Sequence, residues 1–248
     1  MKIYQSILAV TLIFSASLAN AASWLECNGD PGKKIKFKGN STTVSISSYS
    51  YPPSWQSKIK DAVKIVNFNP SPFWINTVVE NDGVGNANGE NEVYYADIEP
   101  PGVARVWSYC YSWSSESSFL GIVYDSASGV EFGLGEVDII LDSTRYVDHD
   151  DDPNTPGVAE ARPWTISDNK SQIDIYGGSK AMAEGVFVHE FGHFLGLMHV
   201  NTEYNIMGDS WEFMITQNGK TRSYFGEDAS KGARQVYGTQ NSWYRDLS

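Results

Sequence analysis

Beyond its first 21 residues, the sequence has no apolar run that approaches the roughly 18 residues of a membrane-spanning helix. Basic residues are also scarce: 18 lysines and arginines stand against 30 aspartates and glutamates, giving a formal net charge of −12. Nucleic acids bind to basic surfaces, so this balance argues against a nucleic-acid partner. The same balance disfavours binding to anionic membranes. We find no internal repeat and no low-complexity linker, which favours a single domain.

The N-terminal segment has the three parts of a secretory signal. Lys2 provides a short basic region, residues 7–14 form an apolar run too short to cross a membrane, and residues 19–21 fit a small-x-small cleavage site. We therefore expect an exported protein without a membrane span. The predicted division is a signal peptide at 1–21, a short N-terminal segment at 22–33, a main domain at 34–238 and a tail at 239–248.

Cysteine is nearly absent, with only Cys27 and Cys110 in the chain. In an exported protein, a lone pair of cysteines is most simply a disulfide. We therefore predict a bond that ties the N-terminal segment to the strand region near Cys110.

Histidine is also rare, yet three of the four histidines fall within eleven residues. His189 and His193 are four residues apart, so on a helix they share one face and can point two imidazoles at one metal ion. Glu190 lies about 100° round the helix from His189, beside the ion without having to bind it. Gly196 is expected to end the helix, because glycine enters the left-handed region at little cost. The chain can then turn and supply His199 as a third ligand.

Three nitrogen ligands with a fourth position open to water are typical of a catalytic zinc site. Zinc lowers the pKa of such a water toward about 7, and Glu190 is placed to act as the general base and later to protonate the leaving amine. The alternative interpretations are two surface histidines beside a solvated glutamate, a non-catalytic zinc-containing binding module, or a zinc hydrolase of a non-peptide acyl bond. The glutamate favours an enzyme, because a purely structural site needs no base.

The residues that follow the histidines reveal a family resemblance. The pattern His-Glu-x-x-His-x-x-Gly-x-x-His with Met207 downstream resembles the metzincin zinc peptidases, which place this methionine in a tight turn beneath the metal, the Met-turn. The eight-residue step from His199 to Met207 is similar to that of the matrixin branch. Residues 136–142 and 228–238 also resemble a matrixin strand and the last matrixin helix. The resemblance covers roughly residues 34–238.

The resemblance implies an α+β fold, with a twisted, mostly parallel sheet over the zinc helix, a Met-turn and a C-terminal helix. It also implies a secreted, zinc-dependent endopeptidase that binds protein or peptide substrates along the sheet edge, and we expect it to be a monomer. Hydrophobic periodicity predicts a first helix from Ser54 to about Asn67 and a zinc helix that begins near Ser179. The predicted strands cover residues 34–37, 42–46, 74–80, 92–95, 103–109, 120–124 and 133–142.

A long acidic segment precedes the zinc helix. The alternating Asp148, Asp150 and Asp152 could supply oxygen ligands to calcium, although Pro153 stands where an EF-hand has glycine. A solvated acidic loop is the alternative interpretation. Matrixins commonly bind calcium in this region.

Two departures from the matrixin pattern limit what can be carried over. Gly208 and Asp209 follow the methionine where the family often has a bulky residue and a proline, so no pocket preference can be inferred. Some matrixins are kept latent by a propeptide cysteine that binds the zinc. The sequence around Cys27 does not match that propeptide motif, so we favour the disulfide over a latency switch.

Overall fold

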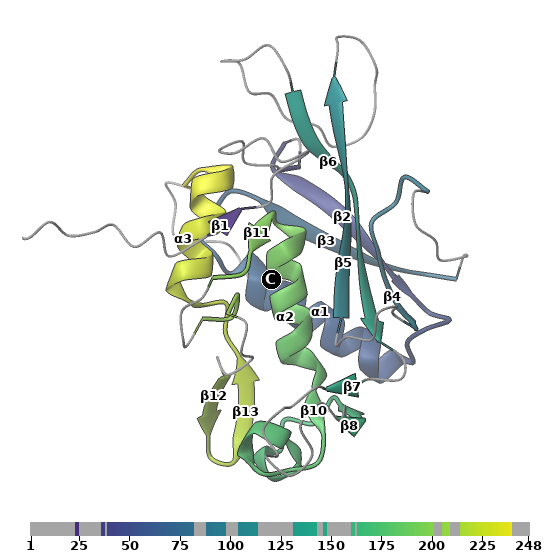
Figure 1. Ribbon diagram of the computed structural model, residues 1–248, viewed down its shortest axis with the longest axis vertical. Coiled ribbons are helices and arrows are strands. Elements are labelled where there is room, and N and C mark those ends of the chain that lie inside the picture. The colour runs from purple at the N-terminus through teal and green to yellow at the C-terminus, as the bar shows by residue number, and fades with distance from the viewer. Residues whose placement is uncertain are drawn as a thin grey trace, which may run out of the picture.

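A five-stranded, mostly parallel sheet and three α-helices make up the principal elements of the fold (Figure 1). The computed structural model describes residues 23–24, 36–37, 39–81, 88–97, 104–113, 131–142, 146–147, 160–161, 163–200, 205–208 and 214–239.

The strands of the main sheet are arranged in the order β3-β2-β4-β6-β5. The four strands β3, β2, β4 and β6 are parallel to one another, and only β5 at the end of this order runs antiparallel. The last four residues of β2 are all buried: Val44 and Ile46 join the main core, and Ser45 and Ser47 lie on the opposite face of the strand. The strand bounds are β2 Ser41–Ser47, β3 Trp74–Glu80, β4 Glu92–Ala96, β5 Ala104–Trp113 and β6 Glu131–Asp142.

Helix α1, Pro53–Asn67, begins with proline, whose fixed φ suits the first helical turn. Its buried positions recur at helical spacing and join the main core: Ile59, Ala62, Val63 and Val66. At its end, the Asn67 side chain accepts a hydrogen bond from the Ile75 backbone N–H (2.9 Å) and donates one to the Ile75 carbonyl (2.8 Å). This side chain therefore fixes the end of α1 against β3.

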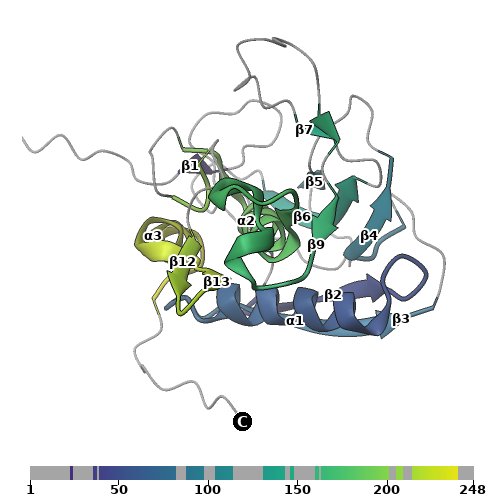
Figure 2. The ribbon, with the colours of Figure 1, turned by 90° about the horizontal axis from the view of Figure 1, so that it is seen from below.

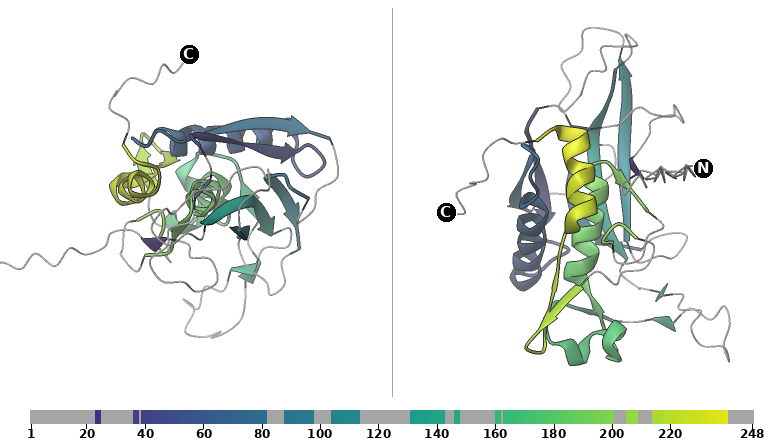
Figure 3. Two further views of the ribbon diagram at one scale, coloured as in Figure 1. Left: turned by 90° about the horizontal axis from the view of Figure 1, so that it is seen from above. Right: turned by 90° about the vertical axis from the view of Figure 1, so that its left-hand side faces the viewer.

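Helix α2, Ala183–Phe194, occupies the centre of the molecule. Figure 2 looks along α2 and shows it surrounded by α1, by α3 (Gly226–Tyr237) and by the sheet strands β5 and β6. Figure 3 shows α1, α2 and α3 side by side. This arrangement leaves few positions of α2 exposed to solvent.

Short strand pairs complete the described chain. The pairs are β1 Ser23–Trp24 with β11 Leu197–Met198, β7 Tyr146–Val147 with β8 Glu160–Ala161, β9 Trp164–Thr165 with β10 Ala181–Met182, and β12 Met214–Gln217 with β13 Lys220–Ser223. Two 3-10 turns, Lys170–Gln172 and Asp174–Tyr176, lie between β9 and β10. Among the residues that the structure describes, no helix has both the length and the apolar character that crossing a membrane requires.

The predicted fold class is confirmed, but the predicted start of the zinc helix is wrong. The helix begins at Ala183 rather than at Ser179. The Lys180 N–H donates to the Gln172 carbonyl, and the Ala181 N–H donates to the Pro163 carbonyl. Because these tertiary partners take up the backbone groups, the segment extends as β10 before the helix starts.

Other predicted segments are only partly described. Lys36 and Phe37 of the predicted strand 34–37 are not in a strand, and Phe37 packs in the core. Residues 1–21 and 120–124 and most of 22–33 lie outside the described part of the chain.

Three buried carboxylic acids, Glu92, Glu136 and Asp138, lie where β4 and β6 pair. The backbone N–H groups of Asn88 and Gly89 donate to the two oxygens of Glu136, and the Glu92 N–H donates to Oδ1 of Asp138 (3.0 Å). Oδ2 of Asp138 is buried without a hydrogen-bond partner in the described part of the chain. Burial first, and then the negative charges of Glu136 and Glu92, raise the pKa of Asp138 to about 8.

This raised pKa predicts stability that depends on pH. Between about pH 4 and pH 8 the folded protein holds a proton on Asp138 that the unfolded chain has lost, so the free energy of unfolding should fall as pH rises through this range. D138N removes this titration, so its free energy of unfolding should fall less than that of the parent as the pH rises. Urea unfolding of both proteins at pH 5 and pH 8 measures the difference. The control is D61N, at a partly exposed position on α1 (39% exposed). If D138N and the parent lose the same stability between the two pH values, Asp138 is not the titrating group.

Candidate metal centre

His189 and His193 project from α2, and the burial of this helix restricts where they can point. Eleven of its twelve residues are buried. Phe187, Val188 and Phe191 pack in the main core, and His189 is itself only 2% exposed. The two imidazoles are therefore held by a helix that is packed on most sides.

The chain turns sharply where α2 ends. The Leu195 N–H closes the helix by donating to the Phe191 and Gly192 carbonyls, and Gly196 then adopts φ +87° in the left-handed region. The expected role of Gly196 thus agrees with its geometry. Strand β11 follows immediately and leads into His199.

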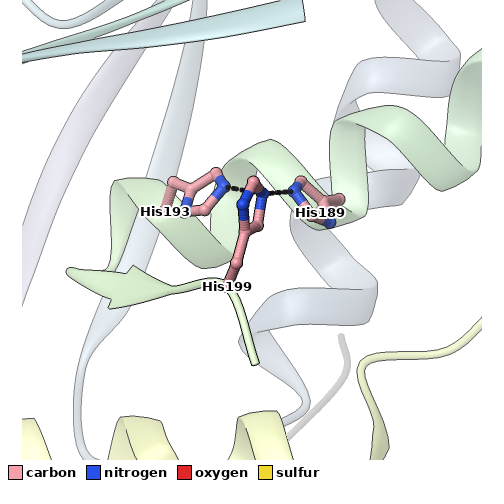
Figure 4. A group of neighbouring side chains, drawn as sticks. All are labelled: His189, His193 and His199. Atoms are coloured by element: carbon pink, nitrogen blue, oxygen red, sulfur yellow. Dashed lines mark hydrogen bonds between the residues drawn. The ribbon is translucent and has the colours of Figure 1, made fainter. Parts of the chain in front are cut away.

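The turn brings the three histidines together (Figure 4). Nε2 of His199 lies 3.0 Å from Nε2 of His189 and 3.1 Å from Nε2 of His193. One nitrogen from each of the three residues falls in a single group compact enough to hold a metal ion. Nitrogens bound tetrahedrally to one zinc at about 2.0–2.1 Å would be about 3.3 Å apart, so this donor set fits zinc.

The opposite ring nitrogens of the two helix histidines are also engaged. The Nδ1 atoms of His189 and His193 hydrogen-bond to the backbone carbonyls of Ile206 and Leu197. A carbonyl can only accept, so in each ring Nδ1 carries the proton and Nε2 keeps its lone pair. Metal-binding histidines are commonly oriented in this way.

Electrostatics favour the neutral, metal-binding form of these rings. Burial is the largest cause that lowers the pKa of His193, to about 4, and it lowers the pKa of His189 well below the usual value. The neighbouring imidazoles add to both effects. Neutral imidazole is the form that binds zinc, so the folded protein prepares both rings for the metal.

Glu190 follows His189 on α2 and is 4% exposed. Burial raises the pKa of its carboxyl group to about 8, which favours the protonated form at neutral pH. The positive charge of a bound zinc ion would favour the carboxylate, the form that accepts a proton.

Met207, the residue of the predicted Met-turn, packs against α2. A Cβ atom added to Gly192 would lie 2.2 Å from Sδ of Met207, so the methionine packs against the helix backbone at that glycine. The Val200 N–H donates to the Met207 carbonyl, and the Met207 N–H donates to the Asn205 side chain (2.9 Å). The turn therefore fixes the Ile206 carbonyl that orients His189.

Other predicted site residues lie outside the part that the structure describes. Asp148, Asp150, Asp152 and Cys27 are not among the described residues, and for Cys110 the structure describes the backbone in β5 alone. The calcium site and the disulfide therefore stay predictions.

Sequence reasoning missed the groups that orient the histidines. The Leu197 and Ile206 carbonyls carry no sequence signal, because any residue supplies a carbonyl. The sequence does contain a signal for close packing at Gly192. A glycine inside a helix is unfavourable, so its presence there indicates that another group approaches the helix backbone closely.

The family comparison agrees with this geometry. The family model described as matrixin matches residues 145–238, which include α2, the histidine cluster, Met207 and α3. The chain is matrixin-like. The match and the three-histidine site together support a zinc metallopeptidase that acts on peptide substrates.

Close packing at Gly192 leads to a prediction about this site. G192A should lower the free energy of unfolding by about 1–2 kcal/mol, because the clash with buried Met207 outweighs the better helix propensity of alanine, which is worth about 1 kcal/mol. The loss is measured by urea unfolding. In an M207A background the same change should cost much less, since Sδ is gone. Equal costs in the two backgrounds would show that Met207 is not the obstacle.

Proposed function

We propose that the protein is an exported zinc-dependent endopeptidase that hydrolyses peptide bonds of protein substrates. The convergence of three Nε2 atoms, with the Nδ1 atoms of His189 and His193 occupied by carbonyls, is the observation that carries this proposal. His189, His193 and His199 would hold the zinc.

When bound, zinc supplies Lewis acidity that activates a water and stabilises negative charge on the scissile carbonyl oxygen. Glu190 would accept a proton from the attacking water and return it to the leaving amine. The raised pKa of its carboxyl group, which follows from burial, suits a group that must both accept and return a proton near neutral pH.

The sheet suggests how a peptide substrate would be positioned. Strand β5 is the outermost strand of the described sheet on the side of α2, and its outer edge is not paired with another described strand. Figure 1 shows β5 beside α2. An extended peptide can add to such an edge through backbone hydrogen bonds, which would place its scissile bond next to the histidine cluster.

Export remains part of the proposal because of the three-part signal in residues 1–21. Cleavage near residue 21 would release a chain that begins shortly before β1. The N-terminal sequence of the protein recovered from the medium or envelope of an expressing cell tests this step.

The assigned base is tested by E190Q, which keeps the shape of the side chain and removes its basicity. We expect cleavage of a denatured protein substrate to fall by about 10²–10⁴-fold, while zinc remains stoichiometric by elemental analysis. The control is E227Q, an exposed glutamate in the first turn of α3. Turnover at the parental rate in E190Q would rule out Glu190 as the base.

The zinc ligands are tested separately. H193A removes one of three nitrogens, so we expect most of the zinc to be lost on dialysis and cleavage to stop. Treatment of the parent with a zinc chelator should stop cleavage in the same way, and added zinc should restore it in the parent alone. Full zinc occupancy in H193A would contradict the ligand assignment. A parent that holds zinc but cleaves only non-peptide acyl bonds, or nothing, would overturn the peptidase proposal.

A further inference from the structure

A buried carboxylate at the start of α2 lies outside the histidine cluster. Glu184 is in the first turn of this helix and is 1% exposed. The helix geometry places it about 7.5 Å along the axis from His189 and about 140° around it, on the side away from the metal centre. Its role is therefore not that of a ligand or a base.

Both oxygens of Glu184 are hydrogen-bonded, and the donors come from two other elements. Oε1 accepts a hydrogen bond from the Ser223 backbone N–H at 3.1 Å. Oε2 accepts one from Nη1 of Arg222 at 3.1 Å and lies 3.5 Å from Nζ of Lys58. Lys58 belongs to α1, and the other two donors belong to β13.

The network continues through Arg222 to the surface of the hairpin that β12 and β13 form. Nη2 of Arg222 lies 3.7 Å from Oδ2 of Asp168, which also pairs with Lys220 at 3.5 Å. Arg222 and Lys220 are 53% and 70% exposed, whereas Glu184 is buried. Figure 1 shows the β12–β13 hairpin beside the end of α2 where the chain enters the helix.

Apolar packing alone does not specify the rotation of a helix that is buried on most sides, because hydrophobic contact is non-directional. Hydrogen bonds to a buried carboxylate are directional, and they are stronger than neutral ones when the groups are charged. A carboxylate left buried without partners is costly, so the helix is held in the one orientation that satisfies Glu184.

We propose that Glu184 is a positioning residue of the metal centre. By bonding to Arg222, Lys58 and the Ser223 N–H, it fixes the rotation of α2 about its axis and the position of α2 along that axis. This in turn fixes where His189 and Glu190 lie. The inference rests on the proposed zinc centre. It makes no use of the peptidase reaction itself, so the metal alone can test it.

The test compares E184Q with E227Q, the same change in the first turn of α3 at an exposed position. Zinc affinity is measured by competition with a chelator, and the visible absorption of the cobalt(II)-substituted protein reports the ligand geometry. We expect E184Q to bind zinc about tenfold more weakly and to show altered cobalt bands. Its kcat should fall about tenfold, with KM changed less than about twofold. E227Q should match the parent.

A second pair of variants keeps the test decisive if E184Q does not fold. R222Q removes a partner of Glu184, whereas K220Q removes a cation of the same strand that pairs with Asp168. R222Q should shift zinc affinity and the cobalt bands in the same direction as E184Q, and K220Q should not.

Parental zinc affinity and cobalt bands in a folded E184Q would overturn the inference, as would equal behaviour of R222Q and K220Q. If the parent cleaves no peptide while E184Q still alters the cobalt bands, the inference stands and the proposed function fails. If the parent is an active peptidase and E184Q leaves the metal centre unchanged, only the inference fails.

Discussion

The burial of α2 is the constraint on which the metal centre depends. A helix with eleven of twelve residues buried has no solvent to satisfy its polar side chains, so each must find a protein partner or a metal. The carbonyls of Ile206 and Leu197 satisfy Nδ1 of the two helix histidines, which leaves their Nε2 atoms on the side of His199. On a helix exposed to water, solvent could replace the two carbonyls as the partner of each Nδ1, and the rings would no longer be held in one orientation.

The two carbonyls come from the chain that follows α2, so the helix and its continuation form one scaffold. Gly196 makes this possible, because its left-handed conformation returns the chain toward the helix as β11. Met207 then packs against Gly192 from below and fixes the turn that holds the Ile206 carbonyl. The two glycines have different roles. Gly192 allows Met207 to approach the helix backbone closely, and Gly196 allows the chain to reverse direction. Only Gly196 belongs to the histidine motif; Gly192 stands at one of its unspecified positions, and the close approach of Met207 explains why a glycine suits that position.

Much of this was readable from the sequence because the signals are local. Spacing placed the three histidines together, and the predicted bounds of β3 and the predicted end of α1 agree with the structure. The sequence-based predictions failed where residues far away in the chain determine the local structure. The start of α2 moved to Ala183 because Gln172 and Pro163 take up the preceding N–H groups. No local sequence signal marks Glu184, because its partners Lys58 and Arg222 lie 126 and 38 residues away in the chain.

Two buried acids of the fold, Asp138 and Glu184, have different surroundings. In the sheet, Asp138 lies among other acids without a basic partner in the described chain, so a proton neutralises it and its state changes near neutral pH. At α2, cations and a backbone N–H satisfy Glu184. A guanidinium keeps its charge throughout the neutral range. The carboxylate at the start of α2 therefore lies against basic side chains, whereas Asp138 lies among acids in the described part of the chain.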